Sequence, residues 1–208
     1  DTWIGTAKSA MGFDVFTADW AKNPSGDHPL VAEFNEVEWK KERDPFGFTR
    51  FTPVFTPLSS SNLATGTDGR ARLSFVPPSA GTYMLDVSGG GTRTQILIWV
   101  GGPGTAAWPE LENSKVELTA DKDSYVPGDT ATVFIPNPFK TNSQALVTVE
   151  RGVFFKTELI TLSGSGRQYS LPLTEDNAPN VYVTATVLGQ NNEFRHGIVN
   201  LPVAANAL

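Results

Sequence analysis

The sequence lacks cysteine altogether, although it has 208 residues. Disulfide bonds, thiolate metal sites and a cysteine nucleophile are therefore excluded. It also lacks an apolar run of membrane-spanning length and the basic, apolar and small-residue regions of a signal peptide, so we expect neither an anchor nor membrane insertion by this chain. Because strand-like sequence begins within a few residues of Asp1, we expect the chain to be a segment of a longer protein.

Basic residues are few as well. Lysine and arginine number 16 against 22 aspartates and glutamates, which gives a net charge of −6. Proteins that bind nucleic acid or anionic lipid present a basic surface. The charge balance therefore argues against nucleic acid as a partner.

Histidine is also scarce, with only His28 and His196 in the chain. His28 stands in a turn and His196 stands between Arg195 and Gly197, and neither has a serine or an acid at the spacing of a catalytic motif. The nucleophile motif G-x-S-x-G does not occur, and the GSGR loop at residues 164–167 is not followed by a helix pattern. We therefore expect no enzyme, no catalytic residue and no bound cofactor.

Three aspartates in the stretch DKDSYVPGD resemble a calcium loop at first sight: Asp121, Asp123 and Asp129. An EF-hand loop needs oxygen ligands at alternate positions, a central glycine and a terminal glutamate. That order is missing here. We therefore predict turn and capping roles for these aspartates and no metal site, with a weak calcium site as the open alternative.

The residues that are abundant favour strands and tight turns. There are 19 glycines and 15 prolines, while hydrophobic residues make up 39% and aromatic residues 11% of the chain. No window shows a convincing helical period, and the length suits two domains of ordinary size. We predict an all-β chain of two tandem seven-stranded antiparallel β-sandwiches, at residues 1–101 and 115–208, joined by a Gly/Pro linker at residues 102–114.

In the first half of the sequence, some strands are indicated by a clear alternation of apolar and polar residues and others are not. Residues 13–20 alternate apolar and polar side chains, and a break in phase near Phe16 indicates a bulge. Residues 30–41 predict a long strand with no purely apolar face, as at a sheet edge or a domain junction. Residues 40–44 predict a charged turn, and residues 57–70 predict a polar, flexible loop.

Four phenylalanines stand close together, and we expect them to form a core face: Phe46, Phe48, Phe51 and Phe55. Pro53 between them indicates an edge strand or a bulge. Farther on, a glycine triplet at residues 89–91 predicts a turn into the most apolar strand of this half, residues 92–100.

The second half alternates more cleanly, and a hairpin is predicted at Arg151-Gly152. Its entry is a corner with its own turn chemistry. Pro127 presets the first central position of a type II turn, and Gly128 accepts the positive φ of the second. Asp129 is then placed to accept hydrogen bonds from the backbone amides that the turn leaves exposed.

Tryptophan occurs at five positions, namely Trp3, Trp20, Trp39, Trp99 and Trp108. Core or junction packing is the common fate of this side chain, and we expect Trp108 of the linker to pack into the junction between the two domains. A sugar-stacking platform is the alternative use of these rings. The two halves also share a faint pattern of Gly-Arg, an alternating strand, a proline turn and a tyrosine-led strand, which is weak evidence for a duplicated module.

The second half resembles a known family. The stretch DKDSYVPGDTATVFIPNPF, followed by ALVTVERGVFF and NAPNVYVTATVLG, is similar to the macroglobulin-like domains of bacterial members of the alpha-2-macroglobulin family. In the first half TDGRARLSFVP, GTYMLDV and ILIWVGG resemble the same domains less specifically. The order of motifs resembles the two macroglobulin-like domains upstream of the bait region.

The resemblance implies a part of a large protease-trapping inhibitor. In such proteins a protease cleaves an exposed bait segment, the molecule rearranges, and in many members a thioester in a Cys-x-x-Gln motif attaches the protease. This chain has no cysteine and no long insertion that could be bait, so no catalytic, cofactor-binding or metal-binding residue is carried over to it. The expected role is a scaffold.

The expected partners are the neighbouring macroglobulin-like domains of the same parent chain, and a trapped protease only through the full-length parent. The expected location is the periplasm, the cell surface or the medium. The alternative from another class is a pair of Ig-like adhesion or glycan-binding modules. That alternative requires two or three coplanar tryptophans on one exposed surface.

Overall fold

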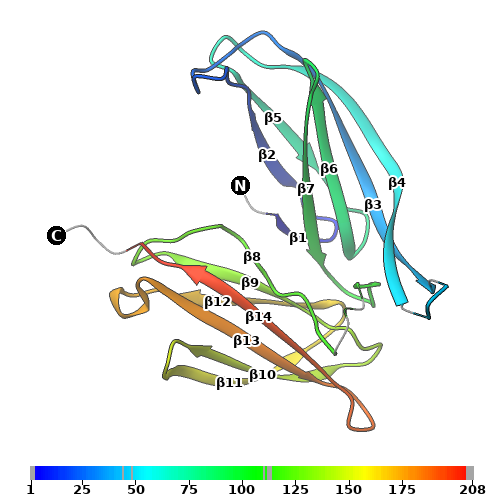
Figure 1. The fold of residues 1–208 in the computed structure, drawn as a ribbon, viewed down its shortest axis with the longest axis vertical. Coiled ribbons are helices and arrows are strands. Elements are labelled where there is room, and N and C mark those ends of the chain that lie inside the picture. Colours follow the sequence, from blue (N-terminus) through cyan, green and yellow to red (C-terminus); the bar gives the residue numbers. More distant parts are fainter. Residues whose placement is uncertain (1–2, 44, 48, 110, 112–113, 205–208) are drawn as a thin grey trace. The chain divides into compact units, whose positions relative to one another are not determined.

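The computed structural model describes residues 3–204 except residues 44, 48, 110 and 112–113. The chain divides into two compact units, Asp1–Val100 and Gly101–Leu208. In the described residues the regular structure consists of fourteen β-strands and one short 3-10 turn (Figure 1). The predicted all-β fold class is confirmed. Within the same residues, no helix is long and apolar enough to cross a membrane.

The first unit holds seven strands in two sheets. Five strands form one sheet in the order β1-β7-β6-β3-β4, and two form the other, β2-β5. The strands are β1 (Ile4–Thr6), β2 (Met11–Phe16), β3 (Pro29–Arg43), β4 (Thr49–Ala64), β5 (Arg70–Phe75), β6 (Gly81–Gly89) and β7 (Thr92–Gly101).

An aromatic cluster joins the two sheets of the first unit. Every second residue of a strand faces the same side, so Phe13 of β2 and Phe75 of β5 point toward Phe34 of β3. The ring of Phe34 stacks on Phe75 with centroids 4.2 Å apart and lies 5.8 Å from Phe13. Tyr83 meets Phe75 edge-on at 5.5 Å. The other buried members are Met11, Ala32, Leu73, Leu85, Ile98 and Val100.

Strands β3 and β4 extend farther than the residue pattern indicates. They form an antiparallel ladder from Pro29–Ala64 to Arg43–Thr49, so residues 40–43 and 57–64 are strand rather than turn and loop. β3 lies between β6 and β4, so the sheet edge, one of the two positions predicted for this strand, is wrong. The edge strand is β4, and it carries Pro53 as predicted. Backbone pairing to a long neighbour holds polar residues in a strand that their side chains alone do not indicate.

The phenylalanines of β4 and of the preceding turn do not form a core face. Phe46 and Phe55 have 86% and 45% of their surface exposed, and Phe51 lies under the ammonium group of Lys41 at 5.7 Å. Phe48 lies outside the described residues. From β4 only Leu63 packs against the aromatic core, because the small sheet covers mainly β3, β6 and β7.

The β-bulge of the first unit lies in another strand pair than the one predicted. β2 ends at Phe16 and its register with β5 is unbroken, so the predicted bulge is not found there. Instead the register of β3 with β4 shifts between Phe34 and Asn35. Burial changes phase at the same place, from Ala32 and Phe34 before the shift to Asn35 and Val37 after it. The extra residue of this bulge is Leu58 of β4, which has no partner in the ladder.

The second unit holds seven strands in sheets of four and three, with the orders β11-β10-β13-β14 and β12-β9-β8. The strands are β8 (Thr119–Ala120), β9 (Thr130–Pro136), β10 (Ser143–Glu150), β11 (Phe154–Leu162), β12 (Gly166–Pro172), β13 (Asn180–Leu188) and β14 (Phe194–Pro202). A single 3-10 turn, η1 (Glu175–Asn177), joins β12 to β13.

Small and branched aliphatic residues fill the core of the second unit. In β10 and β13 the inward positions alternate with outward ones, as the sequence predicts. The fully buried members include Val147, Val149, Val181 and Val183 from the large sheet and Val133 from β9. The predicted hairpin at Arg151-Gly152 is confirmed, since Glu150 of β10 pairs with Phe154 of β11.

Part of the predicted linker is bound to the second unit. The Gly102 N–H donates to Ser165 Oγ at 2.8 Å, and the Trp108 indole N–H donates to the Ser165 carbonyl at 2.7 Å. The Trp108 ring meets Phe134 edge-on at 5.3 Å and keeps 8% of its surface exposed. The burial expected for Trp108 is therefore seen, with these partners in the second unit.

The packing of the aromatic cluster predicts how much the stability of the first unit depends on Phe34. Replacing Phe34 by alanine removes the ring stacked on Phe75 and leaves a cavity, so we expect Phe34→Ala to lower the free energy of unfolding of the first unit by about 3–5 kcal/mol. Hydrogen exchange of peptides from each unit, followed against urea, measures this separately for the two units. Val76→Ala, at an exposed position after β5, is the control and should change stability by less than about 0.5 kcal/mol. A loss below about 1 kcal/mol in Phe34→Ala would contradict the role given to this ring.

Candidate functional site

The stretch that carries the family resemblance forms a tight corner before β9, and we call residues 121–132 the entry corner. The Asp129 N–H donates to the Val126 carbonyl at 3.0 Å, which closes a four-residue turn. Gly128 has a φ of +96°, the conformation that a type II turn requires at its third residue. The predicted turn around Pro127 and Gly128 is confirmed.

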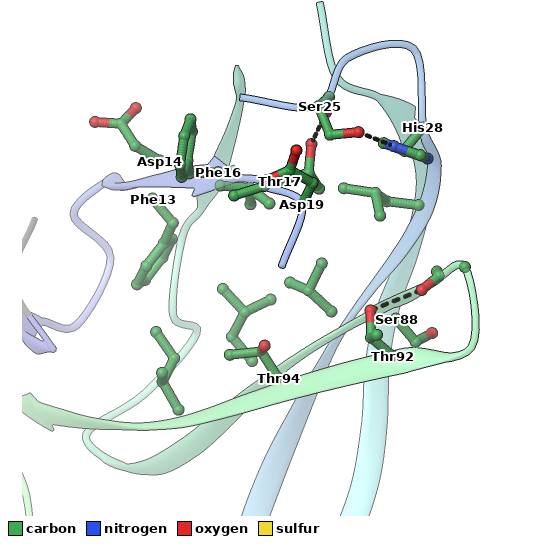
Figure 2. Close-up of a pocket in the computed structure, with 18 of the residues that line it drawn as sticks. Phe13, Asp14, Phe16, Thr17, Asp19, Ser25, His28, Ser88, Thr92 and Thr94 are labelled. Atoms are coloured by element: carbon green, nitrogen blue, oxygen red, sulfur yellow. Dashed lines mark hydrogen bonds between the residues drawn. The ribbon is translucent and has the colours of Figure 1, made fainter. Parts of the chain in front are cut away.

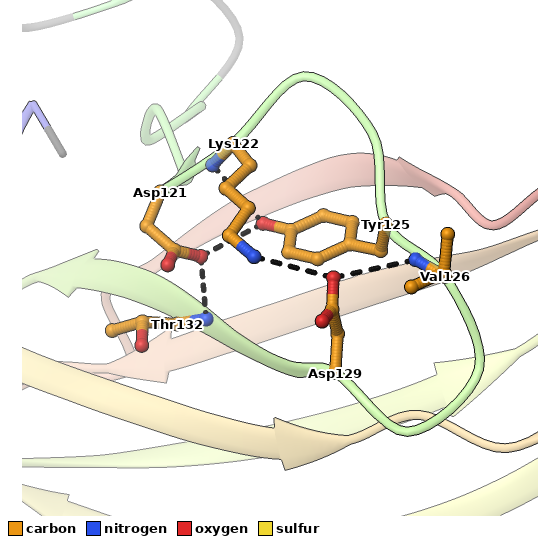
Figure 3. Close-up of polar contacts among 6 residues, drawn as sticks. All are labelled: Asp121, Lys122, Tyr125, Val126, Asp129 and Thr132. Carbon is orange, nitrogen blue, oxygen red and sulfur yellow. Dashed lines mark hydrogen bonds and ion pairs between the residues drawn. The ribbon is translucent and has the colours of Figure 1, made fainter. Parts of the chain in front are cut away.

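Asp129 fastens the two sides of this turn (Figure 3). Its Oδ2 accepts a hydrogen bond from the Val126 N–H at 3.3 Å and forms an ion pair with the Lys122 ammonium group at 3.2 Å. The interaction with Lys122, followed by that with the Val126 amide, lowers the pKa of the Asp129 carboxyl below its ordinary value. The capping role predicted for Asp129 is confirmed.

Asp121 fastens the start of the corner to β9. Its Oδ1 accepts hydrogen bonds from the Tyr125 hydroxyl at 2.8 Å and from the Thr132 N–H at 2.7 Å. Tyr125 is buried, and burial together with the neighbouring carboxylate raises the pKa of its hydroxyl far above the ordinary value. The hydroxyl therefore stays protonated and serves as a donor, not as a titrating group.

The calcium alternative gains no support from this geometry. The oxygens of Asp121 and Asp129 that face the corner are occupied by protein donors, and Asp123 is exposed. In the described part of the chain, no group of three histidine, aspartate or glutamate side chains is placed to hold a metal ion. The entry corner is a structural device that positions β9.

The first unit contains a cleft of about 660 Å³ along β2, a size typical of ligand sites. We call it the first-unit cleft. Its lining is mixed: Val87 of β6 and Ile96 of β7 are apolar, whereas Thr92 of β7 is polar. Figure 2 shows Phe13 and Phe16 on the β2 side and Thr94 on the β7 side of this space. The sequence gives no pattern from which this cleft could be predicted.

His28 has a serine neighbour that sequence spacing did not reveal. Its Nε2 lies 2.7 Å from Ser25 Oγ at the mouth of the first-unit cleft (Figure 2). The backbone N–H of His28 donates to Thr65 Oγ1 at 3.2 Å. Among the described residues, no carboxylate forms a hydrogen bond with the His28 ring. Without an acid to orient the ring, this pair lacks the third member of a hydrolytic triad.

The second histidine lies on the surface of the other unit. The Nδ1 atom of His196, in β14, is 3.2 Å from the hydroxyl of Thr186. That contact joins neighbouring strands across the outer face of the sheet. It is a cross-strand pair of the kind that stabilises sheets.

The five tryptophans do not gather on one surface. Trp99 and Trp108 are buried, and Trp3 and Trp39 are partly buried. Trp20 is fully exposed at the edge of the first-unit cleft, which Trp3 also borders. Burial therefore removes Trp99 and Trp108 from any exposed sugar-stacking platform.

The second unit has a match among protein families. Residues 116–208 match the model of the alpha-2-macroglobulin bait region domain. This segment carries an alpha-2-macroglobulin family domain. The resemblance that the residues of the entry corner indicate is thus confirmed, and the matched model covers the entry corner together with strands β8 to β14.

Individual proteins are similar to this chain at low identity. An alpha-2-macroglobulin homolog of Nostoc sp. is 24% identical over 131 residues, which cover 61% of this chain and 7% of that protein. Native E. coli alpha-2-macroglobulin is 20% identical and covers 98% of this chain and 14% of its own, with a TM-score of 0.41. The D0-D1 domains of intimin cover 97% of this chain and 95% of their own at 14% identity, with a TM-score of 0.38. The chain thus spans less than a sixth of the length of these alpha-2-macroglobulins.

The hydrogen bond from the Tyr125 hydroxyl to Asp121 predicts a measurable contribution to the stability of the second unit. Tyr125→Phe keeps the ring in the core and removes the donor to Asp121, so the free energy of unfolding of the second unit should fall by about 1–3 kcal/mol. Urea unfolding read by hydrogen exchange in β9 and β14 measures the loss. Tyr182→Phe, at a partly exposed position of β13, is the matched control. An equal effect of both substitutions would contradict the special role of Tyr125.

The carboxylate of Asp129 makes a prediction about pH. Because its pKa is lower in the folded chain than in the unfolded chain, its stabilising effect is present above about pH 4 and is lost as the pH falls through the folded pKa. We expect Asp129→Asn to flatten the fall in stability of the second unit between about pH 5 and pH 2. Asp123→Asn removes the same charge from the same corner and serves as the control. Identical pH profiles for wild type and Asp129→Asn would refute this assignment.

Proposed function

We propose that this chain is a scaffold segment of a bacterial alpha-2-macroglobulin-like inhibitor that traps proteases. The observation that carries the proposal is the match of residues 116–208 to the alpha-2-macroglobulin bait region domain. The segment contributes shape and rigidity rather than chemistry. Its described side chains offer cores, turns and cross-strand pairs, as set out above for the entry corner and for His196.

The reactive parts of such an inhibitor lie elsewhere in the parent protein under this proposal. A thioester of the Cys-x-x-Gln type needs a cysteine, and the chain has none. We place the bait segment outside residues 1–208 and downstream of them, as the order of motifs predicts. The description of the matched model supports a position close to the bait.

The two units then serve as two macroglobulin-like domains, which we assign to residues 1–101 and 115–208. Residues 102–114 connect them, and the bonds of Gly102 and Trp108 to Ser165 hold part of this connection on the second domain. We propose neighbouring macroglobulin-like domains of the parent as the partners of both. A protease would meet this segment only within the full-length parent, in the periplasm, at the cell surface or in the medium.

An adhesion or glycan-binding function is the weaker candidate. A sugar platform would use several coplanar exposed tryptophans. Trp99 and Trp108 are buried instead, and Trp20 alone among the described tryptophans is fully exposed. We therefore retain the scaffold function.

A protease assay on the isolated chain and on its parent tests this proposal. The isolated 208-residue chain should leave trypsin activity unchanged on both a protein substrate and a small chromogenic substrate. The parent should suppress cleavage of the protein substrate far more than that of the small one, because a trapped protease is closed off from large molecules only.

Two substitutions in the parent connect that activity to this segment. Val183→Asp puts a charge into the fully buried core of the second unit and should abolish trapping by unfolding it. Thr157→Asp, at an exposed position of β11, should trap normally. Stoichiometric inhibition by the isolated chain, or normal trapping by Val183→Asp, would be incompatible with a scaffold role.

A further inference from the structure

The two units share a strand plan but differ at one position. In the second unit the small sheet has the order β12-β9-β8, and in the described residues of the first unit it has only β5-β2. The large sheets correspond strand for strand, since β11-β10-β13-β14 matches β4-β3-β6-β7. The remaining strand of the first unit, β1, pairs with β7 instead of β2. The place beside β2 that corresponds to β8 is therefore not filled by β1.

In the second unit the chain closes this place itself. Val116 and Leu118 are buried at alternate positions, and the Val116 N–H donates to the His196 carbonyl at 3.0 Å. Thr119 and Ala120 then pair with β9. The fit is close, because a Cβ added to Gly197 of β14 would come within 2.5 Å of the Val116 carbonyl oxygen. One extended segment thus fills the side of the sandwich between β9 and β14.

In the first unit the described residues leave the corresponding side open. The first-unit cleft lies there, bordered by β2 and by the first half of β7, including Thr92, Thr94 and Ile96. β1 reaches only the other end of β7, where the Trp99 N–H donates to the Trp3 carbonyl at 2.7 Å. Residues 7–10 then lead directly into β2, whereas residues 121–129 separate β8 from β9. Among the described residues, this short connection does not take the place that residues 116–120 fill in the second unit.

The edge of β2 offers backbone groups to a further strand. The Thr17 N–H donates to the Gly69 carbonyl in register with the ladder between β2 and β5. In an antiparallel ladder such pairs alternate, so the N–H and C=O groups of Gly12, Asp14 and Phe16 point away from β5. In the part of the chain that the structure describes, these three N–H groups donate to no backbone oxygen. An unpaired edge of this kind is where a peptide adds to a sheet.

The charge of the cleft selects its occupant. Its ionised lining side chains are Asp14 and Asp19, and neither lysine nor arginine lines it. Arg72, opposite Asp14 in β5, forms an ion pair with it at 3.6 Å, but both side chains are well exposed and Asp14 keeps a face open to solvent. A strand that carries a lysine or an arginine complements this acidic edge, whereas an acidic strand is repelled.

We propose that the first-unit cleft binds an extended peptide segment of a partner protein, which adds as a strand along β2. Apolar side chains at alternate positions of the peptide enter the cleft, as Val116 and Leu118 do in the second unit. A basic residue of the peptide faces Asp14 and Asp19. This binding site is independent of the proposed scaffold function and of the match to the second unit.

The strand that closes the second unit supplies a probe. The probe is an acetylated heptapeptide with the sequence of residues 114–120 and the substitution Glu117→Lys, which keeps the alternating valine and leucine and adds a basic residue. Titrated into the ¹⁵N-labelled 208-residue chain, it should bind with a Kd between about 10 μM and 1 mM. Amide shifts should concentrate in residues 12–20 and 85–96, and exchange of the Gly12 and Asp14 amides should slow at least threefold.

Substitutions in the cleft, each compared with a control, test whether the peptide binds at this place. Thr94→Trp fills the cleft from an exposed position of β7 and should weaken binding at least tenfold, while Leu97→Trp, on the opposite face of β7, should bind as wild type does. Asp14→Asn combined with Asp19→Asn should weaken binding about threefold at low salt. Amide spectra of each variant establish that the first unit is folded.

Four results would overturn the proposal. They are no binding up to about 1 mM, equal binding of a peptide with the valine and leucine placed side by side, unchanged binding to Thr94→Trp, and cleft shifts that follow protein concentration without peptide. The last result would assign the cleft to a second copy of the chain.

Discussion

Each unit depends on one constraint, which is that two sheets must bury their apolar faces against each other. A sheet with one apolar face is stable only when another layer covers it. In the first unit the contact is a stack of aromatic rings around Phe34, and in the second it is a dense set of valines. Turns, edges and exposed strands are arranged around these contacts. The same constraint explains why an uncovered stretch of inner face, as in the first-unit cleft, marks a place where something else can bind.

Residue patterns predict the second unit better than the first. Apolar and polar residues alternate along β10 and most of β13, and Gly152 marks the hairpin, so the side of most residues follows from their position. In the first unit β4 runs through serines and threonines whose side chains do not favour one structure. Their strand conformation comes from pairing with β3, a contact between segments distant in sequence. A pattern of single residues does not contain that information.

The sites also differ in how far the sequence predicts them. The entry corner is local, and proline, glycine and aspartate at consecutive positions predict its geometry because each acts on its own backbone or on that of a near neighbour. The bond between Ser25 and His28 is also local, but the loop is held in shape by Thr65 of a distant segment, so the sequence does not predict it. The first-unit cleft is less local still. It results from a strand that is present in one unit and differently placed in the other.

The unpaired edge of β2 has a consequence for the solubility of the chain. Exposed strand edges invite copies of the same protein to pair, and proteins limit this with short edges and charged side chains. β2 is short, and Asp14 stands at its middle. Two copies brought edge to edge would place their carboxylates near each other, and the repulsion would oppose pairing. The short length of β2 and the charge of Asp14 therefore oppose pairing of this edge with a second copy.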